Sequence, residues 1–182
     1  MNEGLIPRRY AKALYKVALE RRCDGSLYQT MAVLSRSFRE HPELQEAVAN
    51  PFVPAAQKTA LLLTAAGNPG EDALTGDFLK LLIRNKRIAA MRDIALAYQE
   101  IYRKANRIYV VNVTSAAPLT PEETGRLEAL ISRHLPEGST VEMETATDPS
   151  LIGGFTVSID NERLDASIKN ELKQLRLKLL SK

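Results

Sequence analysis

The spacing of apolar residues changes once along the chain, and this change is the strongest constraint on its fold. From Leu5 to about Ala105, apolar residues recur every three or four positions, the period of a helix that buries one face. In IYVVNVTS, which follows Arg107, apolar side chains occupy alternate positions, as in a β-strand. The sequence therefore predicts an α+β protein, with a helical domain over residues 1–105 and a smaller α/β domain over residues 106–182.

Turn-forming residues divide the first domain into six helices. Combinations of Gly, Pro, Asn and Asp, together with the basic run at Lys86-Arg87, interrupt the helical pattern. We predict helices over residues 6–22, 25–40, 43–49, 54–66, 72–85 and 88–105. Helices this short are stable only when they pack their apolar faces against each other, so a compact six-helix bundle is expected.

The second domain is predicted to contain a short sheet. Alternating apolar and polar residues indicate three strands, over residues 108–115, 140–147 and 155–159. After the last of these, Asp160-Asn161 supplies a turn, and a short returning strand around Arg163-Leu164 completes a hairpin.

Two helices are expected beside this sheet. In the first, Thr120 can cap the N-terminus and Glu123 completes a capping box around Pro121, which suits the first helical position. The second covers residues 166–180 and is predicted to begin after Asp165 as its N-cap. Its apolar residues follow the 4-3-4 spacing typical of a coiled-coil neighbour, at Ile168, Leu172, Leu175 and Leu179.

The pair Gly153-Gly154 is interpreted as a requirement of the backbone. Loops that cradle phosphate join a strand to the N-terminus of a helix, whereas this pair leads directly into a strand. We therefore expect a positive φ, or the close approach of a neighbouring segment, just before the strand at residues 155–159.

The composition does not indicate catalysis. Two histidines and one cysteine cannot assemble most hydrolytic or zinc sites, so we expect no metal and no cofactor. A small α+β enzyme stays an alternative, but it would need a polar cleft that the sequence does not reveal. Residues 1–105 hold 16 Lys and Arg against 11 Asp and Glu, a net charge of +5, whereas residues 106–182 hold 9 against 11, a net charge of −2. A basic nucleic-acid-binding module and a general protein-interaction module remain alternatives.

Two helices of the first domain have an unusually wide apolar surface. In helix 6–22 apolar residues spread over roughly 240°, and in helix 72–85 over roughly 200°, at about 100° per residue. A helix that faces a single core needs little more than about 100°. Either these two helices are the most buried of the bundle, or they form an exposed apolar groove for an amphipathic partner helix.

Several segments together resemble a known family. In order along the chain they are RRYAKALYKVALE, NPFVPAAQK, FLKLLIRNKRI, VNVTSAAPLT and DPSLIGGFTVSIDNERLDASIKNELKQL. The chain resembles the delta subunit of F-type ATP synthase, called the oligomycin-sensitivity-conferring protein in mitochondria. The most specific part combines Asp148-Pro149, Gly153-Gly154 and Asp165-Ala166-Ser167, with Ala166 where the family commonly has Gly.

The resemblance implies a non-catalytic stator subunit that links the α3β3 head to the peripheral stalk and resists rotor torque in proton-driven ATP synthesis. Such a subunit is peripheral, at the cytoplasmic face of the bacterial inner membrane, without inserting into it. The first and fifth helices would bind the N-terminal helix of an α subunit through Tyr10, Ala13, Leu14, Val17, Phe78, Leu79, Leu82 and Ile83. The C-terminal region would meet the b subunits of the stalk through Ile168, Leu172, Leu175 and Leu179.

Overall fold

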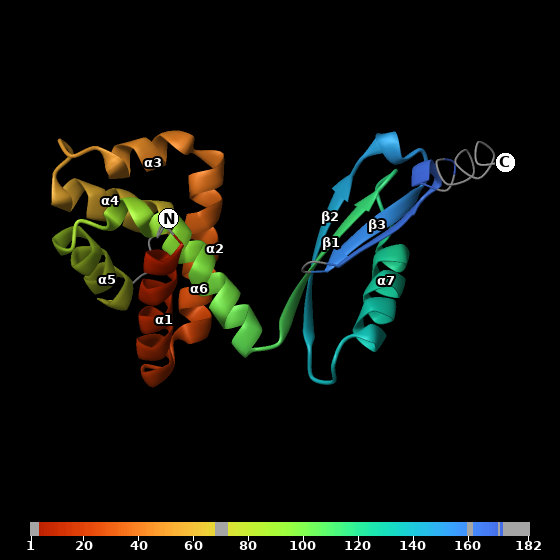
Figure 1. Cartoon of the computed structure of the whole chain (residues 1–182), viewed down its shortest axis with the longest axis horizontal. Coiled ribbons are helices and arrows are strands. Elements are labelled where there is room, and N and C mark those ends of the chain that lie inside the picture. Colours follow the sequence, from red (N-terminus) through yellow and green to blue (C-terminus); the bar gives the residue numbers. More distant parts are fainter. Residues whose placement is uncertain (1–3, 68–72, 160–161, 171, 173–182) are drawn as a thin grey trace. The chain divides into compact units, whose positions relative to one another are not determined.

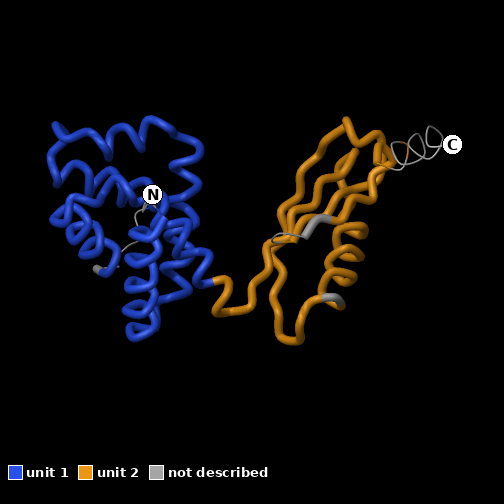
Figure 2. The backbone as a smooth tube through the Cα atoms, viewed as in Figure 1, with its two compact units in different colours: residues 1–102 blue, residues 103–182 orange. Residues whose placement is uncertain are grey.

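The chain forms two compact units, Met1–Tyr102 and Arg103–Lys182 (Figure 2). The computed structural model describes residues 4–67, 73–159, 162–170 and 172 (Figure 1). The described part of the first unit is helical, and the second unit combines a four-stranded sheet with helix. Each unit has its own hydrophobic core. The fold class is therefore α+β, as the sequence predicts.

The described residues of the first unit form six α-helices and one turn of 3-10 helix, drawn from red to green in Figure 1. Their bounds are α1 Leu5–Glu20, α2 Asp24–Glu40, α3 Pro42–Ala49, α4 Ala55–Ala65, α5 Ala73–Arg84, η1 Ile88–Ala90 and α6 Met91–Ala105. Each lies within three residues of its predicted bounds. The predicted sixth helix begins with the 3-10 turn η1.

Helix α6 contributes a completely buried face to the core of the bundle, and two of its polar side chains bind α2. The Tyr98 hydroxyl donates a hydrogen bond to the Asp24 carbonyl at 3.1 Å. The Gln99 amide donates to the Met31 carbonyl at 3.2 Å and to the Ser35 hydroxyl at 2.9 Å. Buried polar groups are stable only when they are hydrogen-bonded, so these contacts fix the register of α6 against α2.

Helices α1 and α5 end in the same way, with a basic residue in the left-handed region. Arg22 and Lys86 both have a φ of 55°. Each helix end has the pair of backbone hydrogen bonds of a Schellman motif. After α1, the Arg22 N–H donates to the Leu19 carbonyl and the Cys23 N–H to the Ala18 carbonyl. After α5, the Lys86 N–H donates to the Ile83 carbonyl and the Arg87 N–H to the Leu82 carbonyl. Glycine is the usual residue at this position, so Arg22 and Lys86 are basic residues where the left-handed backbone favours glycine.

The second unit has the strand order β2-β1-β3-β4. Its elements are β1 Ile108–Ser115, α7 Pro121–His134, β2 Thr140–Thr147, η2 Pro149–Leu151, β3 Gly154–Ile159 and β4 Glu162–Ser167. Strand β1 pairs with β2 in parallel and with β3 antiparallel, and β3 pairs antiparallel with β4 in the predicted hairpin. Helix α7 connects the two parallel strands and covers one face of the sheet (Figure 1). Ile131 of α7 joins Val111, Val113 and Val157 in the core.

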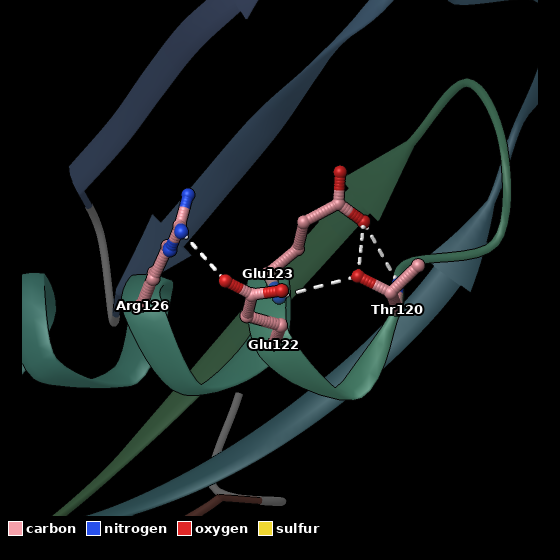
Figure 3. A network of polar contacts seen from close by, with 4 residues as sticks. All are labelled: Thr120, Glu122, Glu123 and Arg126. Atoms are coloured by element: carbon pink, nitrogen blue, oxygen red, sulfur yellow. Dashed lines mark hydrogen bonds and ion pairs between the residues drawn. The ribbon is translucent and has the colours of Figure 1, made fainter.

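The predicted capping box begins α7 (Figure 3). The Thr120 hydroxyl accepts a hydrogen bond from the Glu123 backbone N–H at 3.3 Å, and the Glu123 carboxylate accepts one from the Thr120 N–H at 2.8 Å. The Thr120 hydroxyl also donates to the Glu123 carboxylate, at 2.8 Å. The Thr120 N–H first, and its hydroxyl second, hold the pKa of Glu123 below its ordinary value. One turn into the helix, Arg126 pairs with Glu122 at 2.6 Å.

The predicted N-cap at Asp165 is wrong, because β4 continues through Ser167. Ala166 is still paired with Phe155 of β3, so Asp165 lies within the strand. Its carboxylate accepts hydrogen bonds from the backbone and hydroxyl of Ser167, at 3.1 and 2.6 Å. The Ser167 hydroxyl in turn accepts from the Asn170 N–H at 3.2 Å, so Ser167 caps the following helical turn.

Candidate partner-binding surfaces

A hollow of about 380 Å³ opens beside α1, lined by Ile6, Arg9, Tyr10, Ala13 and Arg87. Ile6, Tyr10 and Ala13 recur at a spacing of four and three residues, which places them on one flank of the helix. The hollow therefore combines an apolar wall with two guanidinium groups.

Tyr10 joins this flank of α1 to α5. Its ring packs edge to face against Phe78, with the centroids 6.4 Å apart. Its hydroxyl accepts a hydrogen bond from the Asn85 side-chain amide at 3.2 Å. On α5, Leu81 lies three residues after Phe78 and four before Asn85, and its side chain is 45% exposed. The surface beside Tyr10 thus receives apolar side chains from both helices.

The structure divides the eight residues predicted to bind an α subunit into two groups. Leu14, Phe78, Leu79 and Leu82 are buried in the core of the bundle, and none is more than 6% exposed. Tyr10, Val17 and Ile83 are partly buried at the edge of that core, and Ala13 is exposed. The wide apolar arcs therefore contain both a core-facing stripe and a flank that reaches the surface.

Ile83 lines a different hollow from the one that Tyr10 and Ala13 line. This second hollow, of about 570 Å³, lies between α4 and α5 and is lined by Ala55, Ala56, Thr59, Ala60, Leu63, Lys80, Ile83 and Arg84. The sequence prediction placed Ile83 in one groove with the α1 residues. The wide apolar arc of helix 72–85 includes residues on both of its flanks, and the pattern alone does not tell which flank faces α1. The prediction also left out Ile6, which lines the first hollow. The spacing of four and three residues between Ile6, Tyr10 and Ala13 would have placed it on the same flank of α1.

In the second unit, the described part of the predicted stalk-binding surface is exposed. Ile168 is 43% exposed and Leu172 is 52% exposed. Leu175 and Leu179 lie outside the described residues. Ile152 is also exposed, at 66%, and has a φ of 67°, a backbone conformation that β-branched residues rarely adopt.

Gly153 and Gly154 stand where neighbouring segments approach the backbone. Gly154 has a φ of 74°, and a Cβ atom there would clash with the carbonyl oxygen of Ala166 in β4. A Cβ on Gly153 would lie 2.5 Å from Cδ1 of Ile168, whose N–H donates to the Gly153 carbonyl at 3.0 Å. Both conditions named in the prediction, a positive φ and a close approach, are met at this pair.

The shifted pKa values lie away from the hollow beside α1. Burial raises the pKa of Tyr98, and the Ser150 N–H lowers the pKa of Asp148, but neither residue lines the hollow beside α1. Among the described residues, no group of three or more His, Cys, Asp or Glu side chains could hold a metal ion. Within the same residues, no helix has the length and apolar character needed to cross a membrane.

Comparison with known proteins identifies the family. The family model of the ATP synthase delta (OSCP) subunit matches residues 6–179. ATP synthase subunit delta of Bacteroides thetaiotaomicron is 36% identical over 183 residues, covering 100% of this chain and 97% of that protein. The subunit delta of Phocaeicola vulgatus is 34% identical over 179 residues, covering 98% and 96%.

The similarity extends to three dimensions. A chain of the Toxoplasma gondii mitochondrial ATP synthase hexamer superimposes with a TM-score of 0.69 at 25% identity, covering 96% of this chain and 97% of that chain. Sequence and fold therefore agree over nearly the full length. The chain belongs to the ATP synthase delta (OSCP) subunit family.

Proposed function

We propose that this protein is a non-catalytic stator subunit that links the α3β3 head of an F-type ATP synthase to its peripheral stalk. In this role it resists the torque of the rotor during proton-driven ATP synthesis. It is a peripheral subunit at the cytoplasmic face of the bacterial inner membrane. The family membership supports a place in the complex, and the surface beside α1 supports the linking role.

The observation that carries the proposal is the apolar flank of α1 next to α5. Ile6, Tyr10 and Ala13 line a hollow there, and Leu81, on the same flank of α5 as Phe78 and Asn85, is exposed. In the family resemblance, the first and fifth helices bind the N-terminal helix of an α subunit. Ala13 is small and exposed, so a partner helix can approach α1 closely at this point. Tyr10 supplies an aromatic anchor that is already held by Phe78 and Asn85.

The mechanical role requires a contact that dissociates slowly. A broad apolar interface with desolvated aromatic anchors meets this requirement, because such anchors slow dissociation. Charges at the rim of an interface mainly accelerate association and hold the complex less. The buried residues Leu14, Phe78 and Leu82 contribute indirectly, since they fix α1 and α5 in the core. At the other end of the proposed link, Ile168 and Leu172 would contact the b subunits, with Leu175 and Leu179 continuing the spacing.

The test is titration of the full chain with a peptide of about 20 residues from the N-terminus of the α subunit of the same organism. Ala13→Gln places a long polar side chain on the proposed contact surface, and we expect at least about tenfold weaker binding. Lys12→Gln is the matched control, because Lys12 is also exposed on α1 but does not line the hollow. Both variants should melt like the wild type. An Ala13→Gln variant that binds the peptide normally would place the partner elsewhere.

A further inference from the structure

The lining of the hollow beside α1 also indicates the chemistry of its partner. We propose that this hollow receives an acidic amphipathic helix, with a carboxylate bound by Arg9 and Arg87 and apolar residues against Ile6, Tyr10 and Ala13. The inference rests on the proposed function, because it concerns the partner of the same surface.

The charge of Arg9 is not offset within the described part of the chain. Arg9 lies in the second turn of α1, and the first turn of α1 contains no acidic residue. The neighbouring Arg8 pairs with Glu100 of α6. Arg9 takes no part in the ion pairs Arg8–Glu100, His41–Glu43, Lys80–Asp77 or Arg126–Glu122 of the described residues. An anion supplied by a partner would provide the missing compensation.

The position of Arg87 is fixed by the turn that ends α5. Its backbone N–H donates to the Leu82 carbonyl at 2.8 Å, and the hydrogen bond between Asn85 and Tyr10 ties the same turn to α1. The dipole of α5 favours cations after its C-terminus and so accounts for a positive charge near Lys86. It does not account for Arg87 lining the same hollow as Arg9. Two like charges at one hollow repel each other, and an anion between them relieves that repulsion.

The apolar part of the lining favours a helix over a free anion. Phosphate would engage the guanidinium groups but leave the apolar side chains of Ile6 and Ala13 in contact with water. A helix with an acidic residue three or four positions from an apolar one presents both groups on one face. Guanidinium groups bind carboxylates through paired hydrogen bonds of defined geometry, so the pair would fix the register of the partner helix.

The experiment combines two peptides with three protein variants. The probes are the α-subunit N-terminal peptide and a version in which every Asp and Glu is replaced by Asn and Gln. We expect the wild-type full chain to bind the acidic peptide about tenfold more tightly, the effect of a charge-assisted hydrogen bond at an interface. The double variant Arg9→Gln, Arg87→Gln should bind both peptides equally. Arg36→Gln is the control, because Arg36 is exposed on α2 and does not line the hollow.

The outcomes separate this inference from the proposed function. Equal binding of both peptides by the wild type, with binding still weakened by Ala13→Gln, would overturn the acidic partner and leave the linking role intact. Failure of the wild type to bind either peptide would overturn the linking role as well. Competition by inorganic phosphate against the acidic peptide but not the amide peptide supports a carboxylate site. Displacement of both peptides by phosphate would assign the hollow to a free anion and overturn the helix.

Discussion

At the scale of single residues, Gly154 is a position where the fold does not tolerate a side chain. Its φ of 74° and the nearby Ala166 carbonyl both exclude a Cβ atom. We expect Gly154→Ala to lower the free energy of unfolding by more than about 1 kcal/mol in urea titrations followed by circular dichroism. Gly125→Ala in α7 is the control, since its added Cβ would meet no atom within 4 Å apart from its chain neighbours and the nearby backbone of α7. That change should be neutral or stabilising by up to about 1 kcal/mol.

Leu14 is predicted to matter for stability rather than for direct contact. The side chain is 3% exposed and belongs to the core of the bundle. Leu14→Ala removes buried apolar volume and should destabilise the first unit by about 2–5 kcal/mol in thermal or urea unfolding. If Leu14→Ala instead melts like the wild type but no longer binds the α-subunit peptide, Leu14 belongs to the contact surface.

The capping box predicts a specific pH dependence. The pKa of Glu123 lies below its ordinary value of 4.5 because the Thr120 N–H, and then its hydroxyl, donate to the carboxylate. A lowered pKa in the folded state contributes stability above the unfolded pKa, and this contribution is lost as the pH falls through the folded pKa. In urea titrations between about pH 5 and pH 3, Glu123→Gln should therefore lose less stability than the wild type. Glu128→Gln, exposed on the same helix, should not reduce the loss.

At the scale of elements, the ends of α1 and α5 provide a matched pair. Arg22 and Lys86 both have a φ of 55° and the same pair of backbone hydrogen bonds. Replacing either with Gly should raise the free energy of unfolding by up to about 1 kcal/mol, because left-handed strain is removed. Lys86→Gly alone should slow association with the α-subunit peptide at low salt, since Lys86 directly precedes Arg87, which lines the hollow. Equal association rates for both variants would contradict a steering role for Lys86.

Helices and strands could be predicted from the sequence where a local signal decides the structure. The period of apolar residues located the six helices, and Thr120 with Glu123 located the start of α7, because each signal acts within one turn. Asp165 was misassigned as a cap because pairing of Ala166 with Phe155 and of Ser167 with Gly154 carries β4 two residues further. The parallel pairing of β1 with β2 joins residues about 30 positions apart, as in Ile108 with Thr140, so no local pattern encodes it.

The candidate site could be predicted only in part. Apolar residues cover more than half of α1, and their spacing alone does not tell which side faces the core. The structure decides this, placing Leu14 inside and Ala13 outside although the two are adjacent in the sequence. Arg87 was missed because its place at the hollow depends on the turn after α5 and on the contact between Asn85 and Tyr10. Such contacts between distant segments follow from packing and cannot be deduced from composition.

At the scale of the whole molecule, we predict that residues 1–105 fold without the rest of the chain. Their core, from Ala11 to Tyr98, lies within the first unit, and the second unit has a separate core. A fragment of residues 1–105 should unfold cooperatively by heat and bind the α-subunit peptide with the affinity of the full chain. A broad, non-cooperative transition, with ordered secondary structure but no fixed packing, would show that the bundle depends on the second unit.

The position of β1 in the sheet affects how the second unit responds to force. The chain leaves the helical unit and enters an inner strand, which has eight residue pairs with β2 and five with β3. A tensile force along β1 from Ile108 would load both ladders in shear, so many hydrogen bonds would have to break together. A force applied across an edge strand would instead peel its bonds apart one after another. Tension between the two units therefore enters the sheet at a strand that is difficult to extract.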